Sequence, residues 1–250
     1  MKILCVSDQI DPLIYNQNAR KNFPDIDLIL CAGDLPMDYI DFIVSVFNKP
    51  TYFIFGNHDL KEFRYYHKVS HNFLPASGIT STETRIIPPT MCESTNVKHE
   101  HGAIYAGFKN LKNQQLVVYN KKGRPTPLLL TGISGSRKYN NGMNQYTDSQ
   151  MQLKLLLLIP RLILNKIMYG RYLDIFLTHA TPLHIHDHED PCHIGFKPFN
   201  WFLRVFKPTY MVHGHIHLYD QREARVSKYE ETQVVNAYAH YIINFNQQKQ

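Results

Sequence analysis

The segment TYFIFGNHD, residues 51–59, decides the fold, because an apolar run stops there on Gly56, Asn57, His58 and Asp59. Other apolar runs end in the same way, on a carboxylate or an imidazole just past their last apolar residue. They are KILCVS before Asp8, LILCAG before Asp34, DIFLT before His179, and TYMVHG before His215, with His217 two residues later. Short apolar runs that alternate with helical patterns predict βαβ units whose parallel strands are buried on both faces.

This alternation predicts an α/β fold. The expected strands cover residues 3–7, 28–32, 52–55, 104–108, 128–133, 174–178, 210–213 and 234–245, and the expected helices cover 37–47, 145–169 (broken or kinked near Pro160) and 199–206. Residues 60–102 have little periodicity and are expected to form a functional surface or to contain short elements. No segment has the composition of a linker, so we expect one domain over residues 1–250, with a frayed tail at 244–250.

The composition excludes several classes of protein. Of the 250 residues, 44% are hydrophobic and 19% are charged, which is ordinary for a globular chain and excludes a disordered or collagen-like one. The four cysteines are too scattered for a disulfide scaffold or paired zinc knuckles. No secretory signal is recognised, and charged residues interrupt the longest apolar segment, 153–167, so a cytoplasmic location without a transmembrane segment is expected.

The basic residues give little guidance on partners. The net charge is +6, but lysine and arginine are spread along the whole sequence. This distribution favours a solvated basic surface over a nucleic-acid site, although a nucleic-acid partner stays open. The oligomeric state is not predicted.

The polar residues at the strand ends predict a metal site. Because ligands bind at the carboxyl ends of the strands in open α/β sheets, these side chains are expected to converge. Asp, Asn and His are donors suited to Mn, Fe or Zn, and their number exceeds what one catalytic zinc requires. Taken singly, an Asp or Asn at a strand end is more typical of a turn, and a single His of a satisfied core or surface side chain. The contiguous sequences GNHD and GHIH are far more specific.

At these residues the sequence resembles the calcineurin-like metallophosphoesterase superfamily. Its motifs, read in order along the chain, appear here as Asp8, Gly33-Asp34, Gly56-Asn57-His58-Asp59, His179 and Gly214-His215-Ile216-His217. The resemblance covers residues 3 to about 220. It implies a four-layer α/β/β/α sandwich with two divalent metal ions, Mn foremost and Fe or Zn as alternatives.

The resemblance also implies a role for each matching residue. One metal would be held by Asp8, Asp34 and His217. The other would be held by Asn57, His179 and His215, with Asp34 bridging the two. His58 matches a histidine of the family that is not a ligand, and that donates to the phosphate or protonates the leaving oxygen.

One position departs from the pattern. The first motif of the family has a histidine two residues after its aspartate, where this chain has Ile10. The first metal therefore loses a donor unless water, Gln9 or Asp11 supplies one. Two interpretations follow: a working site with a more open or weaker first metal, or a site that holds one metal and has altered activity. Because the other ligand positions are all filled by ligand-type residues, we favour the first.

The function that follows is hydrolysis of a small phosphomonoester or phosphodiester by a hydroxide held between two metals. Arg137 is a candidate substrate contact because it lies in the Gly/Ser-rich segment 132–139 that follows an apolar run. Asp187 and His193 are candidates because the segment after His179 resembles a loop that lines the substrate entrance in some bacterial-type phosphoesterases. The alternative is a non-catalytic, protein-binding scaffold on the same fold, supported by Ile10. A nuclease, which would use the same chemistry, also stays open.

Overall fold

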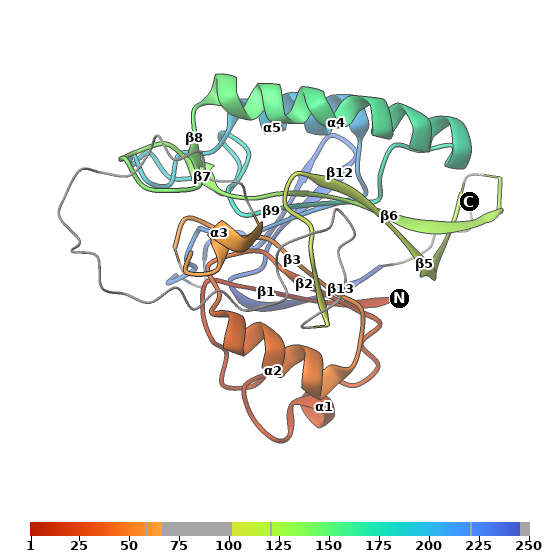
Figure 1. The fold of residues 1–250 in the computed structure, drawn as a ribbon, viewed down its shortest axis with the longest axis vertical. Helices are drawn as coiled ribbons and strands as arrows, with labels where there is room; N and C mark the ends of the chain where they lie inside the picture. Colours follow the sequence, from red (N-terminus) through yellow and green to blue (C-terminus); the bar gives the residue numbers. More distant parts are fainter. Residues whose placement is uncertain (59, 67–101, 121, 221, 246–250) are drawn as a thin grey trace.

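Two β-sheets lie face to face between two layers of helices, as Figure 1 shows. The structure is a computed structural model that describes residues 1–58, 60–66, 102–120, 122–220 and 222–245. The first sheet has the strand order β13-β1-β2-β3-β4. Its strands are β1 (Lys2–Ser7), β2 (Leu28–Cys31), β3 (Thr51–Phe53), β4 (Ala103–Tyr105) and β13 (Ala239–Asn244). Strands β1 to β4 run parallel, and β13 joins β1 antiparallel.

The second sheet has the order β11-β12-β10-β9-β6-β5. Its strands are β5 (Lys109–Tyr119), β6 (Pro125–Ile133), β9 (Ile175–Thr178), β10 (Tyr210–His213), β11 (Val226–Tyr229) and β12 (Thr232–Asn236). The four inner strands are parallel to one another, and β5 and β11 are antiparallel edges. The short strands β7 (Ser136–Arg137) and β8 (Gln145–Tyr146) pair separately.

The helices cover the outer faces of the two sheets. Figure 1 shows α1 (Ala19–Asn22) and α2 (Met37–Phe47) below the first sheet, and α4 (Asp148–Tyr169) and α5 (Lys197–Phe206) above the second. The short α3 (Phe63–Tyr66) follows the GNH segment. Helix α4 begins at a capping box, in which Thr147 and Gln150 each bond the other's backbone N–H, and it ends at Gly170 in the left-handed conformation. None of the helices described here has both the length and the hydropathy needed to cross a lipid bilayer.

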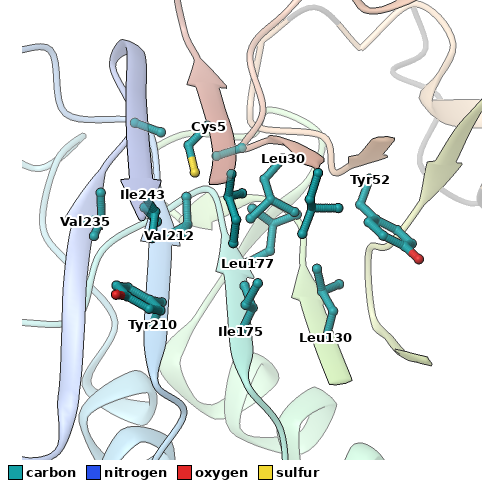
Figure 2. Packing of buried hydrophobic residues seen from close by; sticks show 14 of the residues in the cluster. Cys5, Leu30, Tyr52, Leu130, Ile175, Leu177, Tyr210, Val212, Val235 and Ile243 are labelled. Atoms are coloured by element: carbon teal, nitrogen blue, oxygen red, sulfur yellow. The ribbon is translucent and has the colours of Figure 1, made fainter. Parts of the chain in front are cut away.

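Three apolar clusters hold these layers together. The central one lies between the sheets and joins Leu30 and Cys5 of the first to Leu130, Leu177 and Val212 of the second (Figure 2). The other two lie between each sheet and its helices. Because both sheets are covered on both faces, the apolar strands predicted from the sequence are buried as parallel strands require. The four-layer α/β/β/α sandwich is confirmed.

Several sequence predictions need correction at their boundaries. The predicted strand 234–245 is two strands, β12 and β13, because the chain turns between them and Ala239 takes a φ of 57°. The predicted helix 145–169 begins only at Asp148, after the strand residues 145–146, and it continues through Pro160 without a break. Most of residues 60–102 and the end of the predicted tail lie outside the described residues. Phe245, at the start of that tail, is buried and bonded through its backbone to Met1.

Candidate metal centre

Ligand-type side chains from both sheets converge at the carboxyl ends of the parallel strands. Asp34 follows β2, His179 follows β9 and His215 follows β10. Each of the three offers a ligand atom, and these atoms lie within 4.8 Å of one another. Residues separated by 181 positions in the sequence, Asp34 and His215, therefore share one small volume. These three side chains could hold a metal ion.

His179 is held in the orientation that a ligand requires. Its ring is fully buried, and its Nδ1–H donates to the carbonyl oxygen of Ala32 at 2.9 Å. This bond leaves Nε2 facing Oδ2 of Asp34 at 3.2 Å and Oδ1 of Asn57 at 3.1 Å. A backbone carbonyl that fixes the other ring nitrogen is the usual arrangement around a metal-binding histidine. Three donor atoms thus meet at a point that a proton or a metal ion can occupy.

Asn57 is oriented by a side chain that the sequence did not single out. Its amide Nδ2 donates to the hydroxyl oxygen of Tyr139 at 3.2 Å, so the oxygen Oδ1 faces His179. Nearby, Asn144 donates to the carbonyl oxygen of Gly56 at 2.5 Å. The segment around β7 and β8 therefore supports the turn that carries Asn57.

His215 and Asp8 are joined through the backbone. The N–H of His215 donates to both carboxylate oxygens of Asp8 at 3.0 Å. The His215 ring donates from Nε2 to the carbonyl oxygen of Cys192 at 2.7 Å, which leaves Nδ1 with a lone pair. His217, which is half-exposed, lies with Nε2 3.9 Å from Oδ1 of Asp8 and stacks on Tyr238. Asp8 and His217 thus form a second group beside the first.

Three of these residues leave their strands in the left-handed conformation. Asp8, Asp34 and His215 have φ angles of 64°, 52° and 69°. Such angles are uncommon and unfavourable for residues other than glycine, although Asp and His tolerate them better than most. Each of these angles turns the chain sharply where it leaves the strand, which places the side chain at the end of the strand.

The glycines of the motifs make room for these side chains. A Cβ atom on Gly33 would lie 2.6 Å from Nδ1 of His179, and one on Gly214 would lie 2.6 Å from Oδ2 of Asp8. At Gly56 the conflict is greater, because the added atom would lie 2.0 Å from Oδ1 of Asp34. The three glycines therefore allow the backbone to approach the ligand groups closely.

The electrostatics of the centre favour cation binding. Burial raises the pKa of Asp34, but the charge and hydrogen bond of His179 outweigh this effect and hold the pKa at about 2. Burial lowers the pKa of His179, but Asp34 and Asp8 outweigh it and raise the value to about 9. Burial and the adjacent His179 lower the pKa of His215 to about 3. Burial also raises the pKa of Asp8, and the charge of Asp34 adds to this increase, so an added cation would relieve the cost of charging these acids.

These shifts predict that metal binding releases a proton. Near pH 7 the His179 ring, with its pKa of about 9, is protonated, and a metal needs the same lone pair. We expect release of about one proton when a metal binds at His179, and an affinity that rises about tenfold per pH unit up to that pKa. Calorimetric titration of Mn²⁺ in two buffers of different ionisation enthalpy measures the release, with His179→Gln as the control that abolishes it. Equal heats in the two buffers would contradict the prediction.

Ile10 stands where the family has a metal-binding histidine, and the neighbouring Asp11 does not replace that ligand. Ile10 is exposed, as is Gln9. The carboxylate of Asp11 is engaged elsewhere, because one oxygen accepts from the backbone N–H of Leu13 and the other bonds to His240. Asp11 therefore does not complete the first metal set in this conformation.

The residues predicted to meet substrate lie around the cluster with different partners. His58 is exposed, and its backbone N–H donates to Oδ1 of Asp34 at 2.7 Å. The ring of His193 lies 5.2 Å from that of His215 and bonds to Asp190. Asp187 accepts from the N–H of Gly195 and lines a cavity of about 380 Å³.

The remaining candidate contact, Arg137, pairs with an acidic side chain. Its guanidinium lies 3.8 Å from Asp148, at the start of α4. Asp59 of the GNHD motif lies outside the described residues. Sequence reasoning did not single out Tyr139, Asn144 and Tyr238, because their contacts depend on packing between segments distant in the sequence.

Comparisons with known proteins identify the family and agree with the fold. Residues 1–219 match the calcineurin-like phosphoesterase family, and the chain belongs to this family. Members of this family generally act on phosphoesters with divalent metals in a dinuclear site, and some are non-catalytic. Among curated proteins, none matches the chain.

Solved structures show the same fold at low sequence identity. The crystal structure of TT1561 of Thermus thermophilus is 13% identical with a TM-score of 0.56, and the match covers 95% of this chain and 88% of that one. A second crystal structure is also 13% identical with a TM-score of 0.59, and its match covers 99% of this chain and 96% of the other. These likenesses concern the fold alone.

Proposed function

We propose that this protein is a metal-dependent phosphoesterase that hydrolyses small phosphomonoesters or phosphodiesters at a dinuclear site. The observation that supports this most strongly is the convergence of Asp34, His179 and His215 at the carboxyl ends of strands from both sheets. Carboxylate, amide and imidazole donors suit Mn, Fe or Zn, and we assign Mn²⁺ first. Metal analysis of the purified protein decides among them and counts the ions.

The assignment of ligands follows the two groups of side chains. Asp8, Asp34 and His217 would hold one metal. Asn57, His179 and His215 would hold the other, with Asp34 shared between the two. When bound, the two ions supply the activation of water at neutral pH and the neutralisation of phosphate charge.

The chain's own residues prepare this chemistry. The bonds from His179 to Ala32 and from His215 to Cys192 fix which ring nitrogen is available to a metal. His58 follows the ligand Asn57 directly, and its side chain is exposed beside the cluster. We assign it to donate a proton or hydrogen bond to the phosphate ester or the leaving oxygen. His193, Asp187 and Arg137 are assigned to the substrate side.

Activity assays test the proposal. With Mn²⁺ added, we expect hydrolysis of bis(p-nitrophenyl) phosphate or p-nitrophenyl phosphate, because a metal-loaded site would recognise the phosphate rather than the alcohol. Asn57→Ala and His215→Ala are expected to abolish hydrolysis. The matched control is Asn18→Ala, at an exposed asparagine beside α1 whose side chain makes no capping bond. If the metal-loaded protein is inert toward a broad panel of phosphate esters, the non-catalytic scaffold becomes the better explanation.

A further inference from the structure

The outer face of α4 is apolar and exposed. Its inner face packs on the second sheet and buries Met151, Leu155, Leu158 and Leu162. The large apolar residues that remain exposed are Leu153, Leu156, Leu157, Ile163, Leu164, Ile167 and Met168, of which Leu157 and Ile167 are 72% and 77% exposed. At about 100° per residue they occupy one sector of about 140° opposite the buried face, with Pro160 among them. Single exposed apolar residues are ordinary, but a continuous apolar helix face marks an interaction site.

The charges around this face have one sign. Within α4 the basic residues are Lys154, Arg161 and Lys166, and the only acidic residue is Asp148, which lies 3.8 Å from Arg137. Arg161 and Lys166 are exposed, although the Lys166 ammonium also lies over the ring of Tyr172. Lys154 lies over the rings of Phe108 and Tyr146. The adjacent α5 adds exposed Lys197 and Arg204 and contains no acidic residue. The apolar face is therefore bordered by cations.

This charge pattern distinguishes between two possible partners of the α4 face, a second copy of the chain and an anionic lipid surface. In a two-fold dimer through α4, Arg161, near the middle of the helix, would meet the same basic border on the second copy. Neither α4 nor α5 offers an acidic partner there, because Asp148 lies at the far end of the helix. An anionic lipid surface complements both features, since apolar side chains enter the boundary between headgroups and acyl chains and cations meet the lipid phosphates.

We propose that the α4 face binds the surface of membranes that contain anionic phospholipids. Binding is peripheral, because α4 lies along the outside of the molecule and its inner side is packed on the sheet (Figure 1). The proposal is independent of the proposed catalytic function.

Vesicle flotation with the full chain tests this inference. We expect the protein to float with vesicles of phosphatidylcholine mixed with phosphatidylglycerol, to float far less with phosphatidylcholine alone, and to dissociate as salt is raised. Leu157→Gln with Ile167→Gln should weaken binding to the mixed vesicles about 10- to 100-fold, because each side chain loses its apolar contact with lipid. Both positions are exposed, so the fold should be kept, which circular dichroism and thermal unfolding verify. The matched control is Leu13→Gln, at an apolar residue 55% exposed outside α4 and α5.

Three outcomes would overturn the proposal. The first is a protein that stays in solution with both kinds of vesicle. The second is binding to mixed vesicles that the double substitution leaves unchanged. The third is a dimer, seen by light scattering, that the double substitution converts to monomers, because the α4 face would then be an interface between two copies. None of these results depends on whether the protein hydrolyses phosphate esters.

Discussion

Asp34→Asn is expected to remove phosphoesterase activity, with a fall in kcat/KM of at least about 100-fold. The substitution keeps the size of the side chain and an oxygen that can accept the His58 backbone N–H. It removes the negative charge that lies 3.2 Å from Nε2 of His179 and that would be shared by both metals. The metal content, measured by elemental analysis after dialysis, should fall together with the activity.

Asp25→Asn provides the control for this substitution. Asp25 is exposed and has a φ of 61°, so the change of an aspartate in the left-handed conformation is reproduced away from the site. It should leave activity and metal content unchanged. An Asp34→Asn protein that keeps two metals and normal activity would show that Asp34 is not the shared ligand.

Gly56→Ala is expected to lower both the stability of the fold and the affinity of the site for metal. The new methyl group would lie 2.0 Å from Oδ1 of Asp34 and 2.6 Å from Cε1 of His179, so these side chains must move. We expect the free energy of unfolding of the metal-free protein to fall by about 2 kcal/mol. The Mn²⁺ affinity should fall about 10- to 100-fold, since the ligands lose their alignment. Urea unfolding and metal titration measure the two effects separately.

Gly123→Asn is the control for added volume at a glycine. A Cβ atom there has no neighbour within 4 Å, and asparagine tolerates the φ of 69° better than most residues. This variant should bind Mn²⁺ as the wild type does and lose little stability. If Gly56→Ala behaves in the same way, the close approach around Asp34 does not limit the site.

The sequence was most informative where apolar runs end. The ends of β1, β2, β9 and β10 could be predicted because each strand is mostly apolar and a ligand-type polar residue follows it within a few positions. Strand β5 was not predicted, because KNLKNQQLVVY is a partly exposed edge strand with mixed polarity. The boundary between β12 and β13 was missed because the apolar pattern continues across the turn.

The candidate site was predictable in composition but not in detail. The ligand-type residues could be named, because their types and order follow the motifs. The orientation of each ring could not, since it depends on bonds to the carbonyl groups of Ala32 and Cys192, which carry no side-chain signal. The support of Asn57 by Tyr139 likewise requires that a segment 82 residues away in the sequence fold against it. The roles of the site residues remain predictions that the assays above address.

The left-handed angles at Asp8, Asp34 and His215 affect how this protein can be engineered. Each such angle costs on the order of 1 kcal/mol, and glycine at the same position would avoid that cost. Directed evolution guided by heat resistance alone would therefore reward variants that discard these side chains. Directed evolution of a more thermostable enzyme should therefore measure turnover in every round, because a higher melting temperature and catalytic activity can oppose each other at these three positions.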